Sequence, residues 1–197
     1  MKPWISVTTG LGKIMKAFLP TNPGTLAMQT QGEVLAQSKK CLEAALCAGF
    51  LSSTSPSVNL INAAALAKEQ GLNVSLTHSS CTKESVHPFC MLTATTETVT
   101  LKLMGMVFAN TALLVMINGQ KFSLPMPFSG NLVLYKGEPS SLPNTVGTLS
   151  QGASVTSLMS TSVSDDGSQW FAIMTSQPVS KESISKLYAE NAASVSF

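Results

Sequence analysis

Residues 129–197 alternate between two apolar periods, and this alternation limits the folds open to the chain. Period-two runs, typical of strands, alternate with runs of period 3.6, typical of helices. The pattern predicts strands at 131–135, 155–163, 169–175 and 194–197, one helix through Leu142, Val146 and Leu149, and another through Ile184, Leu187, Tyr188 and Ala192. The order βαββαβ predicts a ferredoxin-like unit, of about the smallest size that can bury a core.

Residues 24–124 predict helices first and an antiparallel meander afterwards. The expected elements are a strand at 25–34, helices at 36–50 and 63–70, an extended segment at 72–77, and short strands between 90 and 124. Asn118-Gly119 is a strong signal for a two-residue hairpin turn, because both central residues of that turn have positive φ. The sequence therefore predicts an α+β protein with two small α/β units, the first of which has a mixed or antiparallel sheet.

The first twenty residues form a helical pattern of their own. Apolar residues recur at helical spacing from Trp4 to Phe18, and Pro20 and Pro23 end the pattern. Nothing precedes this helix for its apolar stripe to cover. We therefore expect the stripe to pack into a partner or into a missing upstream domain.

The expected domain organisation has three parts, at 1–20, 21–128 and 129–197. Charge supports the second boundary, because residues 1–128 carry nine Lys and five Glu, whereas residues 129–197 carry three Lys and five acidic residues. These counts correspond to net charges of +4 and −2. The difference suggests two units with different histories.

The composition excludes several classes of function. All 12 cationic residues are lysines, so the chain has no guanidinium for bidentate binding of phosphate. Neither part has the basic stripe of a nucleic-acid or membrane-surface protein. The N-terminus does not resemble a signal peptide, and the apolar stretches are too short to span a membrane. Irregularly spaced cysteines favour free thiols in the reducing cytoplasm, at Cys41, Cys47, Cys81 and Cys90.

Few motifs could carry chemistry, and we predict no catalytic, cofactor-binding or metal-ligating residue. Gly10-Leu-Gly12 lacks the third glycine and the preceding strand of a dinucleotide loop. His78 and His87 have no partner at the spacing of a nucleophilic or metal site. Asp165-Asp166-Gly167 is interpreted as a hairpin turn in preference to a carboxylate pair.

Lys83, His87 and Lys121 are the one set of cationic residues that could meet around a small anion, because loops often carry such sites. The alternative interpretation is ordinary solvated surface, which is common for lysines on turns. Cys81 and Cys90 could in principle join this set as zinc ligands. A buried structural thiol is the more common role for a cysteine.

Several segments form a recognisable series along the chain: Lys2-Pro-Trp-Ile5 with Leu11-Gly12, Gly24-Thr25 with Gln31-Gly32, Val58-Asn-Leu-Ile-Asn-Ala63, Lys68-Glu-Gln-Gly-Leu-Asn-Val74 with His78-Ser79, and Ser162-Val-Ser-Asp-Asp-Gly167 with Trp170. In this order, and over nearly the whole chain, they resemble animal-type D-3-phosphoglycerate dehydrogenases. The resemblance implies that 1–20 are the last helix of a catalytic part. It also implies that 21–128 are an intervening, allosteric-substrate-binding domain and that 129–197 are an ACT-type domain.

The resemblance further implies an NAD-dependent, tetrameric oxidoreductase of serine biosynthesis. Its nucleotide-binding fold and its catalytic His, Glu and Arg would lie upstream, so this chain would hold no cofactor. ACT domains that bind an amino acid usually place a glycine in the first strand-to-helix loop and an asparagine before the second strand. Ser141 and Ser154 stand at those positions. An interface role is therefore favoured over feedback by serine.

Three functions follow, in order of preference. The first is a regulatory and oligomerisation part of a D-3-phosphoglycerate dehydrogenase, which is not an enzyme alone and which forms a homo-oligomer through 129–197. The second is a free-standing sensor that holds a phosphorylated hydroxy acid at Lys83, His87 and Lys121. A self-contained enzyme is the third, and no set of residues supports it. None of the three involves nucleic acid or a membrane.

Overall fold

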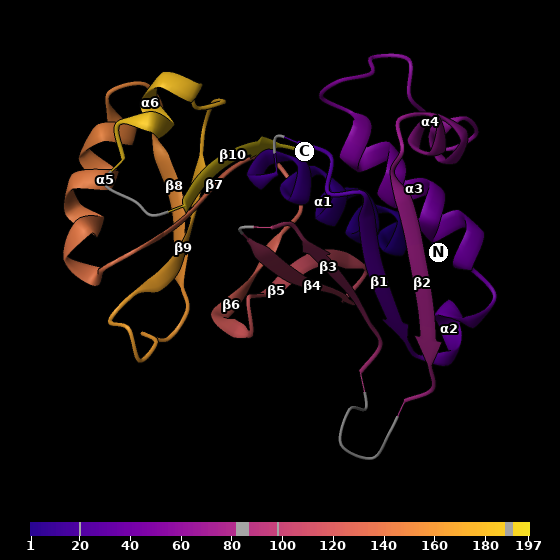
Figure 1. Ribbon diagram of the computed structural model, residues 1–197. Coiled ribbons are helices and arrows are strands. Elements are labelled where there is room, and N and C mark those ends of the chain that lie inside the picture. Colours follow the sequence, from indigo (N-terminus) through magenta and orange to yellow (C-terminus); the bar gives the residue numbers. More distant parts are fainter. Residues whose placement is uncertain (20, 82–86, 98, 188–190) are drawn as a thin grey trace. The chain divides into compact units, whose positions relative to one another are not determined.

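The computed structural model describes residues 1–19, 21–81, 87–97, 99–187 and 191–197 (Figure 1). The chain divides into two compact units, Met1–Asn118 and Gly119–Phe197. Both combine helices with a sheet, so the predicted α+β class is confirmed. None of the described helices is both long enough and apolar enough to cross a membrane.

The first unit contains four helices and five strands in its described part. The helices are α1 (Lys2–Phe18), α2 (Glu33–Ala36), α3 (Lys39–Leu51) and α4 (Ala63–Glu69). The strands are β1 (Thr25–Gln31), β2 (Asn73–Ser79), β3 (Phe89–Thr95), β4 (Thr100–Phe108) and β5 (Thr111–Ile117). The sheet order is β2-β1-β3-β4-β5, and it continues along the chain into β6 (Gln120–Pro127).

The sheet of the first unit is mixed, as the sequence predicts. β1 runs parallel to β2, whereas β1–β3, β3–β4 and β4–β5 are antiparallel. Asn118 and Gly119 have φ of 49° and 84°, which confirms the predicted hairpin turn. Ala109 and Asn110 form a second such turn, with φ of 46° and 62°. Sequence analysis did not identify that turn, because alanine is rare at positive φ.

Helix α1 packs inside the first unit, against α3 and the strands β4 and β5. Its apolar stripe is buried there, through Trp4, Val7, Leu11, Ile14 and Met15. The expectation that this stripe packs into a partner or another domain is therefore wrong. The helix at the start of the chain has its own core to cover, because α3 and the sheet supply it.

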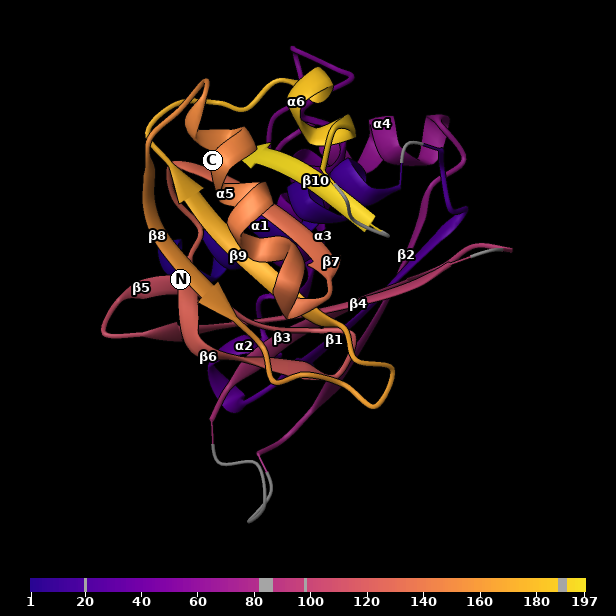
Figure 2. The same cartoon turned by 90° about the vertical axis from the view of Figure 1, so that its left-hand side faces the viewer.

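The second unit has the strand order of a ferredoxin-like fold. Its elements after β6 are β7 (Asn131–Gly137), α5 (Leu142–Ser150), β8 (Val155–Ser160), β9 (Gln169–Thr175), α6 (Lys181–Ser185) and β10 (Asn191–Ser196). The four strands pair in the order β10-β7-β9-β8, all antiparallel. Figure 2 shows α5 lying across this sheet. The predicted βαββαβ unit is confirmed.

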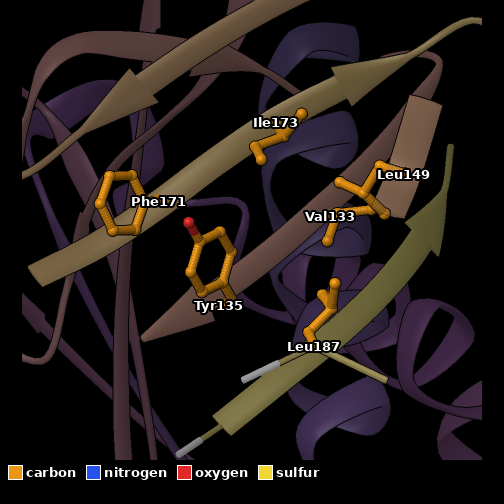
Figure 3. Packing of buried hydrophobic residues seen from close by; sticks show 6 residues of the cluster. All are labelled: Val133, Tyr135, Leu149, Phe171, Ile173 and Leu187. Carbon is orange, nitrogen blue, oxygen red and sulfur yellow. The ribbon is translucent and has the colours of Figure 1, made fainter. Parts of the chain in front are cut away.

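Side chains from the sheet and the helices form one core on that face, as Figure 3 shows for Val133, Tyr135, Leu149, Phe171, Ile173 and Leu187. The rings of Tyr135 and Phe171 stack, with centroids 4.8 Å apart. One helix end differs from the sequence prediction. The sequence predicts Ala192 at the end of a helix. It lies instead in β10, where it pairs with Tyr135, because residues 191–196 pair along the edge of β7.

Candidate functional site

Two of the three residues of the predicted anion site, His87 and Lys121, lie in the described part of the chain. His87 is exposed and stands two positions before β3. Lys121 is exposed on β6, in the second unit. Lys83 lies outside the described residues. The joint anion site of these three residues therefore stays a prediction.

A different polar pair lies at the end of the two parallel strands. Thr30 of β1 is fully buried, and its Oγ1 lies 2.9 Å from Nδ1 of His78 on β2. The same hydroxyl donates to the carbonyl oxygen of Thr77 at 3.3 Å. When Thr30 donates to that carbonyl, Nδ1 of His78 is the donor to Thr30, and Nε2 is left to accept a hydrogen bond.

Gly32 and Pro88 are in close contact beside this pair, at the point where the chain enters β3. Gly32 has φ of 109°, and a Cβ added there would lie 2.8 Å from Cβ of Pro88. Only glycine fits such a position. Pro88 and the adjacent His87 are thereby placed at the carboxyl end of β1. The ends of parallel strands are a common place for ligands in α/β sheets.

The chemistry of this strand end is hydrogen bonding, supplied by hydroxyl, imidazole and backbone groups. Among the described residues, no three His, Cys, Asp or Glu side chains gather in a way that could hold a metal ion. Sequence analysis missed the Thr30–His78 pair, since the two residues are 48 positions apart and meet only through strand pairing. The signal available was the His78-Ser79 dipeptide at the end of an expected strand.

The first strand-to-helix loop of the second unit is filled by its own side chains. The Ser141 hydroxyl donates to the carbonyl oxygen of Glu138 at 2.7 Å. It would also lie 3.0 Å from a Cβ added at Gly137. The Tyr135 hydroxyl is buried behind this loop, and no described residue forms a hydrogen bond with it. Burial raises the pKa of Tyr135, and the nearby Thr145 and Ser141 hydroxyls oppose that rise, although neither makes a well-aligned hydrogen bond with the phenol.

Asp165-Asp166-Gly167 forms the predicted turn between β8 and β9. The Gly167 amide donates to the carbonyl oxygen of Ser164 at 2.9 Å, and Gly167 has φ of 80°. Asp166 accepts hydrogen bonds from Lys136 of β7 at 2.8 Å and from the Ser168 amide at 2.9 Å. Lys136, together with Ser168 and Ser164, holds the pKa of Asp166 well below its usual range. This carboxylate thus holds the turn on the sheet.

The glycine pair in α1 serves helix packing and does not fit a nicotinamide dinucleotide. A Cβ added at Gly12 would lie 2.5 Å from the carbonyl oxygen of Leu46 and 2.8 Å from the amide nitrogen of Phe50, both on α3. Gly10 is also buried within the helix. The backbone around Gly12 is therefore in contact with another helix and cannot cradle a pyrophosphate.

With this geometry established, comparison with known proteins identifies the family. A sequence model of the D-3-phosphoglycerate dehydrogenase intervening domain matches residues 1–118. The chain belongs to the D-3-phosphoglycerate dehydrogenase family. The resemblance seen in the sequence is thereby confirmed. The residues matched to the intervening domain include α1 and end at Asn118, the last residue of the first compact unit.

Relatives within this dehydrogenase family extend the similarity into the second unit. The D-3-phosphoglycerate dehydrogenase of Rattus norvegicus is 35% identical over 178 residues, that of Sus scrofa 33% over 177, and that of Homo sapiens 32% over 177. Each match covers 86% of this chain and 33% of the relative. The chain thus spans about a third of the length of these dehydrogenases.

The most specific of the dehydrogenase-like segments, Val58–Ala63, is a turn fixed by two asparagine side chains. The Asn59 amide donates to Oδ1 of Asn62 at 2.8 Å, and the Ile61 amide donates to Oδ1 of Asn59 at 2.8 Å. Ile61 itself is 95% exposed. Side-chain amides therefore hold this turn in place ahead of α4, while Ile61 stays exposed to solvent.

Proposed function

We propose that this chain is a regulatory and assembly part of a D-3-phosphoglycerate dehydrogenase of serine biosynthesis. The observation that carries the proposal is the match of residues 1–118 to an intervening domain, in a chain that covers a third of its dehydrogenase relatives. In this proposal the NAD-binding and catalytic residues belong to another part of the enzyme. The four free cysteines fit a cytoplasmic location, where thiols stay reduced.

The packing of α1 supports the assignment of the redox chemistry to another part. Hydride transfer to a nicotinamide needs a glycine-rich turn between a strand and a helix, so that backbone amides can face the pyrophosphate. The glycine pair of this chain lies inside a helix that packs on α3. We therefore expect no NAD-dependent oxidation of 3-phosphoglycerate by the chain alone.

The regulatory role would be exercised by a phosphorylated hydroxy acid at the predicted anion site. Ammonium groups of Lys83 and Lys121 attract a doubly charged phosphate, and His87 contributes when it is protonated. Since the chain has no arginine, no bidentate clamp can form. The affinity should therefore be weak, on the order of millimolar, which corresponds to about −4 kcal/mol.

The second unit would serve assembly as an ACT-like domain. Its sheet ends in β10 on one side, and an edge of this kind can pair with another copy, whereas β6 contacts β8 on the other side. The closed Glu138–Ser141 loop supports this interface role over an amino-acid site, because Ser141 satisfies the Glu138 carbonyl within the loop. We therefore do not propose serine as an effector.

Isothermal titration calorimetry tests the regulatory part of the proposal. We expect 3-phosphoglycerate to bind the wild type at millimolar concentration and to bind Lys83→Ala and Lys121→Ala at least several-fold more weakly. Lys40→Ala, an exposed lysine on α3, is the matched control and should bind like the wild type. Binding unchanged in both site variants would show that these lysines are ordinary surface residues.

A coupled assay tests the enzymatic part. The purified chain is incubated with NAD and 3-phosphoglycerate, and NADH is followed by its absorbance. Turnover that persists through repeated purification would contradict the proposal. A chain that binds 3-phosphoglycerate but neither assembles nor associates with a nucleotide-binding domain would instead be a free-standing sensor.

A further inference from the structure

Strand β2 forms the free edge of its sheet. In the order β2-β1-β3-β4-β5-β6 its one partner among the described strands is β1, over seven residues and in parallel register. Figure 1 shows β2 as the outermost arrow on its side of the sheet. One row of its backbone groups therefore faces away from the sheet.

Two hydrogen bonds identify which residues belong to that outer row. The Asn73 amide donates to the carbonyl oxygen of Gly24 at 2.8 Å, and the Ser79 carbonyl accepts from the Gly32 amide at 3.1 Å. In a parallel ladder, alternate residues bond to the same neighbour. The odd-numbered residues of β2 therefore face β1 with their backbone, and Val74, Leu76 and His78 present their N–H and C=O groups outward.

Within Asn73–Ser79, the sequence and register lack the features that usually protect a free strand. Asn73–Ser79 contains no proline and no Lys, Arg, Asp or Glu, and its register with β1 is continuous. The edge strand β8, by contrast, has a register shift between Val155 and Ser157. Charges, prolines and bulges are the devices that keep an edge from pairing, so β2 is suited to accept another strand.

The spacing of the outer groups fits a second copy of the same strand. In an antiparallel pair centred on Leu76, Val74 lies opposite His78 of the other copy, and Leu76 lies opposite its own equivalent. All three outward N–H groups and all three C=O groups of each copy then find partners. A two-fold axis perpendicular to the sheet relates two copies of the strand in this antiparallel way.

The side chains are compatible with the same register. Ser75 and Thr77 are exposed on one face of β2. Across the two-fold axis, Ser75 of each copy would lie opposite Thr77 of the other, so that two hydroxyl pairs form. No like charges meet.

We infer that two copies of this chain pair through β2, in antiparallel register centred on Leu76, and so join their sheets into one. The inference is independent of the proposed function and of assembly through the second unit.

Analytical ultracentrifugation of the full chain tests the inference. Ser75→Lys/Thr77→Lys places lysines opposite each other at Cα separations of about 4.5 Å, without changing a buried residue. Thr100→Lys/Thr111→Lys adds the same charge at exposed positions on β4 and β5 and is the control. We expect the wild type and the control to have twice the mass of the Ser75/Thr77 variant.

A charge-complementation arm separates pairing from damage to the fold. Ser75→Glu/Thr77→Glu alone should also halve the mass, and an equal mixture with the lysine variant should restore it. Amide exchange should be slow at Val74, Leu76 and His78 in the wild type and fast in either variant. Equal masses for all proteins, no restoration on mixing, or fast exchange in the wild type would each overturn the inference. If amide exchange of β2 becomes slow only after a different protein is added, the β2 edge binds that protein and not a second copy.

Discussion

Gly49 of α3 lies so close to Thr9 of α1 that a Cβ added to the glycine would collide with the threonine carbonyl oxygen. The two helices therefore touch backbone to backbone at this point, with Gly12 making the reciprocal approach to Leu46 and Phe50. This contact leaves no room for a side chain between the helices, and it fixes α1 as part of that unit's core.

Gly49→Ala should therefore destabilise the chain by about 1–3 kcal/mol, because overpacking outweighs the better helix propensity of alanine. Gly147→Ala is the matched control. Gly147 lies on α5 with nothing within 4 Å of an added Cβ, so this change should stabilise by about 0.5–1 kcal/mol. Urea denaturation measures both changes. A Gly49→Ala protein as stable as the wild type would show that the helices can separate without cost.

Tyr135→Phe should stabilise the second unit by about 1 kcal/mol, since it removes a buried hydroxyl without a hydrogen-bond partner in the described part of the chain. The ring and its stacking on Phe171 are kept. Phe171→Leu, which loses the stacked ring, is the comparison and should be less stable than the wild type. Thermal unfolding followed by circular dichroism reports both. A loss of stability in Tyr135→Phe would mean that the hydroxyl is satisfied, for example by water.

The lowered pKa of Asp166 predicts that the folded chain loses stability in acid. Its pKa is lower in the folded chain than the value of about 3.9 in an unfolded one. The stability it contributes is therefore present above about pH 4 and is lost as the pH falls through the folded pKa. Asp166→Asn should flatten the acid limb of a stability–pH profile. Asp165→Asn changes an exposed neighbour with no hydrogen bond in the described structure and should leave the profile unchanged. Identical profiles for the two variants would contradict the turn network.

Thiol reactivity should divide the four cysteines into two pairs. Burial raises the pKa of Cys90 to about 12 and, with Glu43 adding to the effect, that of Cys47 to about 11. Cys81 is exposed and Cys41 is partly so. In native protein a disulfide reagent should label Cys81 and Cys41 first, and label Cys47 and Cys90 only after unfolding. Peptide mapping of the labelled sites checks this order. Early labelling of Cys90 would show that β3 opens readily.

Local patterns in the sequence were enough to predict much of this fold. The period of α1, the βαββαβ order and the Asn118-Gly119 turn depend on residues near one another in the chain. The features that were missed depend on distant residues. No nearby sequence pattern indicates that Gly12 contacts α3, that Thr30 forms a hydrogen bond with His78, or that Ala192 pairs with β7 in a strand.

The same distinction between nearby and distant residues decides what could be predicted of the candidate site. Asp165-Asp166-Gly167 could be interpreted as a turn because glycine and aspartate determine turn geometry locally. The predicted anion site would bring together His87, which precedes β3, and Lys121 of β6, and such a meeting of distant residues leaves no local signal. Their convergence depends on how the whole chain folds, and periodicity does not report that.

The parallel pairing of β1 with β2 also has a consequence for the order of folding. Strands β3 to β5 form hairpins that close within a few residues, whereas Thr30 reaches His78 only after a separation of 48 residues that includes α3 and α4. Closing a loop of that length costs chain entropy before any contact compensates it, so pairing of this kind is slow. The pairing of β1 with β3 also spans distant residues, such as Thr30 and Cys90. The meander of β3 to β5 should therefore form first, and β1 and β2 should join the sheet after it.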